Sequence, residues 1–284
     1  MLQISELTIN WHILEACNYD CYFCYAKYGQ KSIFSRHYAK ILRELGTLNR
    51  RRIDFQNGCV IAESVRINFA GGEPFLEKEL GQAIALAFDL GLRPSFISNG
   101  SLLTDDFIMK FGPMISVAGF SVDSFDDEQN RRIGRHDNRG TQVGYERMAD
   151  IFRAFRQVSP NTLLKINTVV CRENVRDDLT LPLCELRPDR WKALRVIPIH
   201  GATDRGISDE EFSSFLKRHR DVPGKIVPED NGDMHRSYIM LNPDGCFYQR
   251  EGSGYLDSAP ILDVGAATAL QSIEFDAETY FSRY

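Results

Sequence analysis

CNYDCYFC, residues 17–24, places three cysteines within eight positions, directly after an apolar run that we predict to be a strand. Three thiolates this close together can bind one metal centre. A closed tetrahedral zinc site or an ordinary iron–sulfur cluster uses four protein ligands, so Cys17, Cys21 and Cys24 are one short. A cluster bound by three cysteines keeps one iron open to a reacting ligand, and we therefore expect catalysis here.

The cysteines alone leave two interpretations open. A zinc site completed by a histidine elsewhere would make the protein a zinc-binding interaction module. The spacing CxxxCxxC, with Phe23 before the last cysteine, is instead typical of the radical S-adenosylmethionine (SAM) superfamily. In that superfamily, which the motif resembles, three cysteines bind a [4Fe–4S] cluster and SAM chelates the fourth iron.

Composition and charge exclude several functional classes. The chain has 284 residues, 43% hydrophobic and 26% charged, enough for one large globular domain or two small ones. Seven cysteines, four of them scattered, suggest a reducing cytoplasm and not a secreted disulfide framework. No signal peptide is evident, and no apolar stretch approaches the roughly 20 residues of a membrane helix. The net charge of −5 argues against nucleic-acid and membrane-surface binding, so an anionic substrate would need a local cluster of cations.

Short β-rich runs alternate with helical patterns as far as about residue 220. The predicted strands are residues 7–14, 65–69, 93–97, 116–121, 163–170 and 192–199. Apolar residues at helical spacing follow at 34–48 and 80–88, and Ser208 with Glu211 forms a capping box before another helix. This α/β alternation predicts a partial (β/α)6 TIM-like barrel, with its chemistry at the carboxyl ends of the strands.

Residues from 222 onward depart from this pattern. Two apolar runs flank the turn sequence NPDG at 242–245, which predicts a hairpin. We expect residues 1–221 to form the barrel and residues 222–284 to form a C-terminal extension that covers the active site, within a single structural unit.

Polar sequences follow three of the predicted strands. The glycine pair in GGEP, residues 71–74, lets the backbone approach a ligand closely. Residues 98–99 end the third strand, and Ser121 and Asp123 share one face at the end of the fourth, where they could bind a ribose. Arg135 has the side chain suited to bidentate binding of a carboxylate. Taken singly, each could be an ordinary turn or surface residue.

Basic residues recur on the second, fifth and sixth predicted strands. Each strand carries a cation and another polar residue at positions i and i+2: Arg66 and Asn68, Lys165 and Asn167, Arg190 and Lys192. One such pair usually marks a solvated face. Three pairs on barrel strands need a compensating charge inside the barrel, and the simplest is a concentrated anion such as a triphosphate.

Further motifs, in collinear order along nearly the whole chain, resemble the viperin family of radical SAM nucleotide enzymes. They are NFxGGEPFL (68–76), SNGSL (98–102), SxDSFD (121–126), IGR (133–135), KIN (165–167), RWK (190–192), SDEEF (208–212), HRSYIML (235–241) and ILDVG (261–265). RWK and SxDSFD in this order are specific to the family, whereas GGEP and the cysteines mark only the superfamily.

The resemblance implies roles for individual residues. Cys17, Cys21 and Cys24 would bind the [4Fe–4S] cluster. The expected SAM contacts are Gly71, Gly72, Glu73, Ser98, Asn99, Ser121 and Arg135. The expected substrate contacts are Arg66, Asn68, Lys165, Asn167, Arg190 and Lys192. Tyr238, near the reacting sugar, could donate a proton or the final hydrogen atom, and either Lys165 or Tyr238 could be the general acid.

The resemblance also implies a reaction in antiviral defence. A deoxyadenosyl radical removes hydrogen from C4′ of a ribonucleoside triphosphate, the 3′-hydroxyl leaves as water, and a 3′-deoxy-3′,4′-didehydro nucleotide results, which terminates RNA chains. CTP is the first expectation for the substrate, with UTP or GTP as alternatives. A flavodoxin or ferredoxin type of protein would supply electrons, and we expect a monomer.

Two departures from animal members of the family affect these expectations. This chain starts at the first strand, without an amphipathic membrane helix, so we expect a soluble cytoplasmic enzyme. It also ends without the basic aromatic tail that follows in the relatives, which bears on cluster loading and closure of the pocket. A radical SAM GTP cyclase or peptide-modifying enzyme is the alternative, but those carry further C-terminal cysteine clusters, and Cys246 is the only cysteine after Cys184.

Overall fold

The computed structural model describes residues 2–24, 31–197, 206–230, 236–251 and 254–282. Within these ranges, eleven strands form one sheet in the order β11-β10-β9-β1-β3-β4-β5-β6-β7-β8, with β2 paired to β3. The strands are β1 Leu2–Leu14, β2 Arg52–Phe55, β3 Gly58–Gly71, β4 Arg93–Ser98, β5 Val117–Ser121, β6 Leu163–Val170, β7 Arg190–Arg195, β8 Lys225–Glu229, β9 Ile239–Leu241, β10 Phe247–Glu251 and β11 Gly254–Asp257. The run from β9 to β8 is parallel throughout, and the hairpins β2–β3, β9–β10 and β10–β11 are antiparallel.

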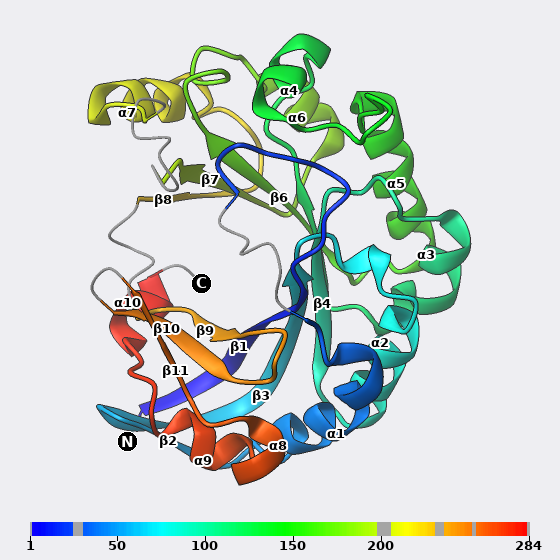
Figure 1. Ribbon diagram of the computed structural model, residues 1–284. Helices are drawn as coiled ribbons and strands as arrows, with labels where there is room; N and C mark the ends of the chain where they lie inside the picture. The colour runs from blue at the N-terminus through cyan, green and yellow to red at the C-terminus, as the bar shows by residue number, and fades with distance from the viewer. Residues whose placement is uncertain (1, 25–30, 198–205, 231–235, 252–253, 283–284) are drawn as a thin grey trace.

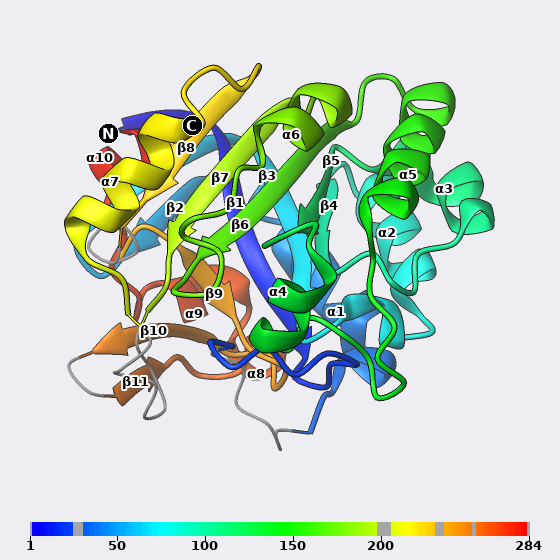
Figure 2. The same cartoon turned by 90° about the horizontal axis from the view of Figure 1, so that it is seen from above.

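The sheet curls into an open barrel, with helices on its convex side (Figure 1). The α-helices are α1 Phe34–Gly46, α2 Leu80–Asp89, α3 Asp105–Phe111, α4 Asp127–Ile133, α5 Tyr145–Val158, α6 Thr180–Leu186, α7 Asp209–Arg218, α8 Ile261–Val264, α9 Ala266–Leu270 and α10 Ala277–Ser282, with 3₁₀ turns η1 Pro74–Leu76 and η2 Gly112–Met114. Figure 2 shows α6 and α7 covering the part of the sheet that ends in β8. This arrangement confirms the predicted partial TIM-like barrel.

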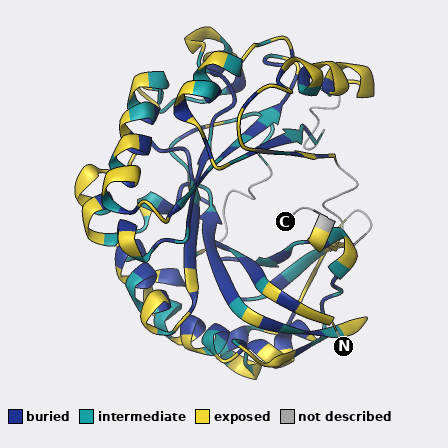
Figure 3. Cartoon of the chain, turned by 180° about the vertical axis from the view of Figure 1, so that it is seen from behind, coloured by how far each residue is buried: buried dark blue, intermediate teal, exposed yellow. Residues whose placement is uncertain are grey.

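The hydrophobic core lies between the sheet and its outer helices. Most residues in the barrel strands β4 and β5 are buried, and burial alternates along β6, while the helices expose their outer faces to solvent (Figure 3). Aromatic rings fill much of this layer: the ring of Phe96 lies 5.8 Å from that of Phe120 and 6.3 Å from that of Phe155. The inward-facing residues of the same strands are therefore the ones left for chemistry.

All six predicted barrel strands are present, and β1, β3 and β7 differ most from their predicted bounds. β1 begins at Leu2 and not at residue 7. β7 spans Arg190–Arg195 and not 192–199, because it pairs with β6 from Lys165 onward, and residues 198–199 lie outside the described residues. β3 begins at Gly58, because its first half forms a hairpin with β2 that the sequence did not predict. The capping box at Ser208 and Glu211 is confirmed at the start of α7.

The segment after residue 221 adds strands at both ends of the sheet. β8 pairs in parallel with β7, and β9 pairs in parallel with β1. The predicted hairpin around the NPDG turn is confirmed as β9 and β10. Farther along the chain, α10 packs against β1. Its Tyr280 hydroxyl donates a hydrogen bond to the Glu6 carbonyl oxygen (2.8 Å) and accepts one from the Thr8 amide (3.1 Å). None of the helices in the described ranges is long and apolar enough to cross a membrane.

Candidate active site

The predicted cations converge inside the barrel. Strand register places Lys165 beside Arg190, and Asn167 beside Lys192, on the inner face of β6 and β7. Burial lowers the pKa of Lys165 well below its usual range, and the charges of Lys192, Arg66 and Arg190 lower it further. Three cations near enough to act on a buried lysine give this part of the barrel a local positive charge that can attract an anion.

Two carboxylates, one buried and one partly exposed, balance part of this charge. Glu229, on β8, contacts the Nζ atom of Lys192 with Oε1 and accepts a hydrogen bond from the Tyr238 hydroxyl at Oε2 (2.6 Å). The Lys192 Nζ atom also lies 3.2 Å from the Tyr238 oxygen, so the three side chains form a closed ring of contacts. The Lys192 and Glu229 side chains are only 5% and 1% exposed.

Glu6 on β1 is the second carboxylate. Its Oε1 lies 2.7 Å from Arg66 Nε, and its Oε2 lies 3.1 Å from Arg93 Nε. Arg66 also donates to the hydroxyl of Thr8 (2.8 Å), its partner on the adjacent strand. Contacts with Glu6 and Thr8 therefore hold Arg66 against β1. The contacts among Lys192, Glu229 and Tyr238 lie on the other side of the barrel interior, at β7 and β8. Within the described residues, Lys165 forms no ion pair with a carboxylate, although it lies within electrostatic reach of Glu229.

The two predicted asparagines differ in their surroundings. The Asn68 side chain donates to Asn10 Oδ1 (2.9 Å) and accepts from Ser95 (3.0 Å), so a polar network fixes it. The Oδ1 atom of Asn167 is buried and has no hydrogen-bond partner within the described part of the chain. A buried, unsatisfied acceptor next to four cations is the kind of atom that a bound ligand satisfies.

The cysteine loop follows β1 and rests on the end of α4. The amide of Asp20 donates to the carbonyl of Gly134 (3.1 Å), and the amide of Tyr22 donates to that of Ile133 (3.1 Å). Gly134 has a φ of +88°, and a Cβ there would lie 2.1 Å from the Asp20 carbonyl oxygen. Only glycine fits this contact, so α4 fixes where the loop lies.

The three thiols have the chemistry that an iron–sulfur cluster requires, and they lie on one loop. All three are partly exposed, and the charge of Cys24 raises the pKa of both Cys17 and Cys21, so the thiols lie within electrostatic reach of one another. Burial is the largest cause of both shifts and takes the pKa of Cys21 to about 12. No group of three or more His, Cys, Asp or Glu side chains in the described ranges is already arranged as a metal site. Metal binding must therefore displace the thiol protons and draw the sulfurs together.

Arg135 lies between the cysteine loop and the end of β5. Its guanidinium is 3.7 Å from Cys21 Sγ and 3.3 Å from the buried carboxylate of Asp123, and it donates to the carbonyl of Ser121. Its carbon Cζ lies 5.5 Å from the ring centre of Tyr19. A small hollow beside these groups is lined by Tyr19, Asn99, Ser121, Asp123, Asn130 and Arg135.

The GGEP segment packs against the start of the cysteine loop. A Cβ at Gly71 would lie 2.2 Å from the Leu14 carbonyl oxygen, and one at Gly72 would lie 2.0 Å from that of Ala16. The Glu73 amide donates to the same Ala16 carbonyl oxygen (2.9 Å). The two glycines thus let β3 and the residues just before Cys17 touch.

Glu73 is buried and ties the GGEP segment to the end of β4. Its carboxylate accepts hydrogen bonds from Ser98 Oγ (2.8 Å), the Asn99 amide (2.8 Å) and the Phe75 amide (3.1 Å). Burial raises its pKa, and these donors oppose the rise. Asn99 in turn donates to Asn18 Oδ1 in the cysteine loop (2.9 Å).

The sequence did not single out several inward-facing residues. Glu229 was missed because Pro228 interrupts the strand pattern, although an edge strand such as β8 tolerates a proline. His12 was missed as well, yet it is buried on β1, and its Nδ1 lies 2.9 Å from the Tyr248 hydroxyl. Burial lowers the pKa of His12 to about 4, so its imidazole is neutral at physiological pH. The alternation of Thr8, Asn10 and His12 along β1 is the signal that could have found it.

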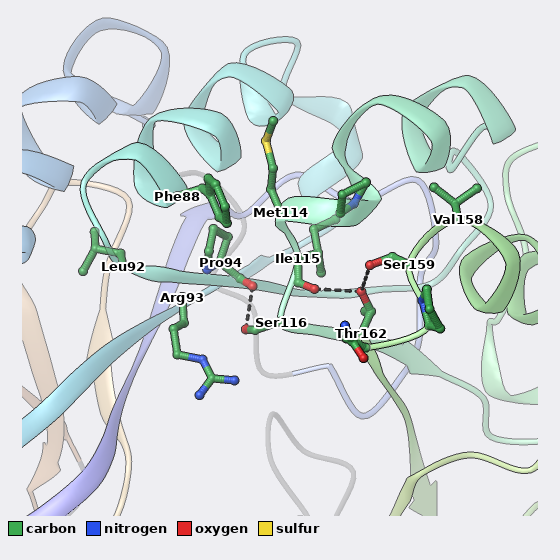
Figure 4. A pocket seen from close by; sticks show the side chains of 13 residues that line it. Phe88, Leu92, Arg93, Pro94, Met114, Ile115, Ser116, Val158, Ser159 and Thr162 are labelled. Atoms are coloured by element: carbon green, nitrogen blue, oxygen red, sulfur yellow. Dashed lines mark hydrogen bonds between the residues drawn. The ribbon is translucent and has the colours of Figure 1, made fainter.

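A different hollow, of about 420 Å³, opens at the amino ends of β4, β5 and β6 (Figure 4). Leu92, Met114 and Val158 give it an apolar wall. The Ser116 and Thr162 hydroxyls there donate to the backbone carbonyls of Pro94 and Ile115 (both 2.8 Å). It lies at the end of the barrel opposite the cysteine loop. Its Ser116 and Thr162 hydroxyl hydrogens are already used in hydrogen bonds to the backbone.

Comparisons with known proteins agree with this geometry. Residues 11–180 match the radical SAM superfamily. The chain is 37% identical to an S-adenosylmethionine-dependent nucleotide dehydratase from Pseudoalteromonas ulvae, over all of this chain and 94% of that protein. It is also 37% identical to a protein of the same name from Psychrobacter lutiphocae, over 99% of this chain and 95% of that protein.

A solved structure supports the fold. Native anSMEcpe with bound AdoMet aligns with a TM-score of 0.69 at 13% identity, over all of this chain and 82% of that one. The matched region contains the cysteine loop, the GGEP segment and Arg135, and the full-length relatives also cover Glu229 and Tyr238. The chain therefore belongs to the radical SAM superfamily and, within it, to the viperin family of S-adenosylmethionine-dependent nucleotide dehydratases.

Proposed function

We propose that this enzyme dehydrates a ribonucleoside triphosphate, with CTP as the first candidate and UTP or GTP as alternatives. The product would be the 3′-deoxy-3′,4′-didehydro analogue, an antiviral terminator of RNA chains. The convergence of Arg66, Lys165, Arg190 and Lys192 inside the barrel is the observation that carries this proposal. The printed names of the relatives, nucleotide dehydratases, support the same substrate class.

The cofactors of the superfamily are a [4Fe–4S] cluster and SAM. Cys17, Cys21 and Cys24 would hold the cluster. We assign SAM to the neighbouring residues Gly71, Gly72, Glu73, Ser98, Asn99, Ser121 and Arg135. When bound, these cofactors supply a 5′-deoxyadenosyl radical that removes the hydrogen from C4′ of the nucleotide. Glu73 would keep the SAM-facing backbone of the Gly71–Gly72 turn in register with the end of β4, since its carboxylate is bonded there.

The residues of the barrel interior would bind and orient the nucleotide. The four cations would hold the triphosphate, and the unsatisfied Asn167 Oδ1 would accept a hydrogen bond from the sugar or base. Asn68, fixed by Asn10 and Ser95, would contribute a rigid polar contact. Lys165 has a lowered pKa, so its protonated form would be a ready acid for the departing 3′-hydroxyl. Tyr238 would face the reacting sugar.

We infer a cytoplasmic monomer that receives electrons from a flavodoxin or ferredoxin type of protein. We also infer that residues 222–284 act as an extension of the 1–221 barrel that closes over the substrate, excluding solvent during the radical steps.

Anaerobic reconstitution followed by iron and zinc assays tests the metal centre first. The proposal expects a brown, oxygen-sensitive protein that contains iron, whereas a zinc-binding module would be colourless. The reconstituted protein is then incubated with SAM, a reductant and each nucleotide in turn. One triphosphate should stimulate 5′-deoxyadenosine formation, and the corresponding nucleoside should not. If no nucleotide does so, the dehydratase proposal fails.

A further inference from the structure

We propose that the Glu229 carboxylate accepts the phenolic proton of Tyr238 when Tyr238 supplies the electron that completes the nucleotide product. This inference rests on the dehydratase function proposed above. It makes Glu229 a positioning and proton-accepting residue, in a part of the site where the chain otherwise gathers cations.

The contacts of Glu229 are those of a proton acceptor. The Tyr238 hydroxyl donates to its Oε2 at 2.6 Å, the short distance of a hydrogen bond to a charged oxygen. Lys192 contacts the other oxygen, Oε1, and its positive charge favours the ionised carboxylate. Lys192 also donates to the Tyr238 oxygen (3.2 Å), which fixes the direction of the phenolic hydrogen toward Glu229.

A carboxylate is unexpected in this place. Glu229 is 1% exposed, and it opposes the binding of the polyanion that the surrounding cations favour. Neutralising Lys192 would not require a contact with Tyr238, because the lysine already occupies Oε1. The shared carboxylate thus links a phosphate-binding cation to the tyrosine, and that link suits proton movement better than simple charge balance.

Tyr238 and Glu229 together complete the reduction of the sugar. Once C4′ has lost its hydrogen and the 3′-hydroxyl has left as water, the sugar is a radical cation, one electron short of the C3′=C4′ double bond. Tyr238 gives one electron to the sugar, and its O–H proton moves to Glu229 Oε2. The nucleotide product is then closed-shell, Tyr238 is a neutral phenoxyl radical, and Glu229 is a carboxylic acid. A low-potential one-electron donor then reduces Tyr238, and Glu229 returns the proton.

The hydrogen bond matters because a phenol that has lost an electron is a strong acid. Without an acceptor in contact, the electron cannot leave at a useful rate, since the charged phenol would be stranded in a site already rich in cations. Positioned proton transfer of this kind contributes on the order of 10²–10⁴-fold to a rate.

Turnover of the holoenzyme separates this role from a structural one. Glu229→Gln keeps the shape of the side chain but cannot take up the proton, so nucleotide-dependent 5′-deoxyadenosine should still form while the product yield per 5′-deoxyadenosine falls by about tenfold or more. Tyr238→Phe should show the same uncoupling, and the double variant should be no worse than Tyr238→Phe alone, because both residues serve one step. Glu229→Asp should recover part of the coupling.

Lys192→Met is the matched control for lost charge balance. It removes the other partner of Glu229 and should raise the KM for the nucleotide. Because Lys192 also orients the Tyr238 hydroxyl, the product yield per 5′-deoxyadenosine should fall as well, but by less than in Glu229→Gln, which keeps the lysine and removes the proton acceptor. If Glu229→Gln raises KM with normal coupling, Glu229 serves only to hold the lysine and the proposal is overturned.

A second measurement uses the apoprotein and needs no cluster. A light pulse activates a photo-oxidant that removes one electron from tyrosines, in the wild-type protein and in Tyr238→Phe. The difference between their tyrosyl-radical signals reports the Tyr238 radical. Glu229→Gln should slow the growth of that signal by about tenfold or more; an unchanged rate would overturn the proposal. If no nucleotide stimulates wild-type turnover, the dehydratase function fails, and this measurement still decides whether Glu229 accepts the proton.

Discussion

The carbonyl of Gly134 accepts a hydrogen bond from the amide of Asp20 at 3.1 Å, with the backbones so close that a Cβ on Gly134 would lie 2.1 Å from the Asp20 carbonyl oxygen. The end of α4 thus supports the loop that carries Cys17, Cys21 and Cys24. Arg135, the next residue, reaches Cys21 Sγ from the same turn. The cysteine loop and Arg135 are therefore placed by one structural feature.

Gly134→Ala should displace the cysteine loop and reduce iron loading. The substitution introduces the clash with Asp20 and also strains a backbone at φ +88°, which costs about 1–3 kcal/mol. Iron content after anaerobic reconstitution and the thermal unfolding midpoint measure the two effects. Gly140→Ala is the matched control, because Gly140 has a φ of +78° but nothing within 4 Å of the added Cβ. Equal iron loading of the two variants would contradict the placement of the loop by α4.

Nucleotide binding should take up a proton at Lys165. Burial and the cations Lys192, Arg66 and Arg190 lower the pKa of Lys165 well below 10.5, and a bound triphosphate would raise it again. Because the ligand favours the protonated lysine, affinity should weaken as pH rises above the lowered pKa. Calorimetry of the apoprotein in buffers with different ionisation enthalpies measures the uptake. Lys165→Met should show less uptake; uptake equal to that of the wild type would assign the proton elsewhere.

The same shift predicts the pH dependence of stability. Between the lowered native pKa of Lys165 and its unfolded value near 10.5, the unfolded chain binds more protons than the folded one. The free energy of unfolding contributed by this group therefore rises with pH across that window. Below the window the buried lysine is charged in the folded protein, and its burial lowers the free energy of unfolding. Lys165→Met should be more stable than the wild type at neutral pH, with the difference shrinking toward pH 10.5. Urea unfolding of both apoproteins at several pH values checks the trend, which a constant difference would contradict.

Arg190→Gln should weaken triphosphate binding more than monophosphate binding. The side chain lies beside Lys165 on the adjacent strand, and a charge-assisted contact to phosphate is worth about 2 kcal/mol, or roughly thirtyfold in affinity. Fluorescence or calorimetric titration with CTP and CMP measures both constants. Arg153→Gln, which removes an exposed ion pair with Asp150 on an outer helix, is the control and should leave both unchanged. Equal losses of affinity for CTP and CMP would show that Arg190 does not contact the phosphates that only CTP carries.

Much of the barrel could be predicted because its strands carry strong local signals. Residues 163–170 and 93–97 are β-rich runs between amphipathic helices, and the alternation sets which residues point inward. The same period of two placed Lys165 with Asn167, and Arg190 with Lys192, on the face that lines the barrel interior.

The remainder depends on contacts between distant parts of the chain. Glu229 lies on an edge strand with a proline, so only its pairing with β7 identifies it as an inward residue. His12 acquires its environment from Tyr248, 236 positions away. Asp123 and Glu73 look like turn residues in sequence, and their burial against Arg135 and residues 98–99 appears only in the folded chain.

The transfer of hydrogen from C4′ of the nucleotide tests the central claim most directly. The reconstituted enzyme is given SAM, a reductant and CTP carrying deuterium at C4′, and the 5′-deoxyadenosine and nucleotide are analysed by mass spectrometry; UTP and GTP labelled in the same way follow. The account predicts one deuterium in 5′-deoxyadenosine. The nucleotide product should be lighter than the labelled substrate by the mass of HDO, because it loses the deuterium from C4′ and the hydroxyl from C3′. Unlabelled 5′-deoxyadenosine with every labelled nucleotide, or no nucleotide product, would contradict it.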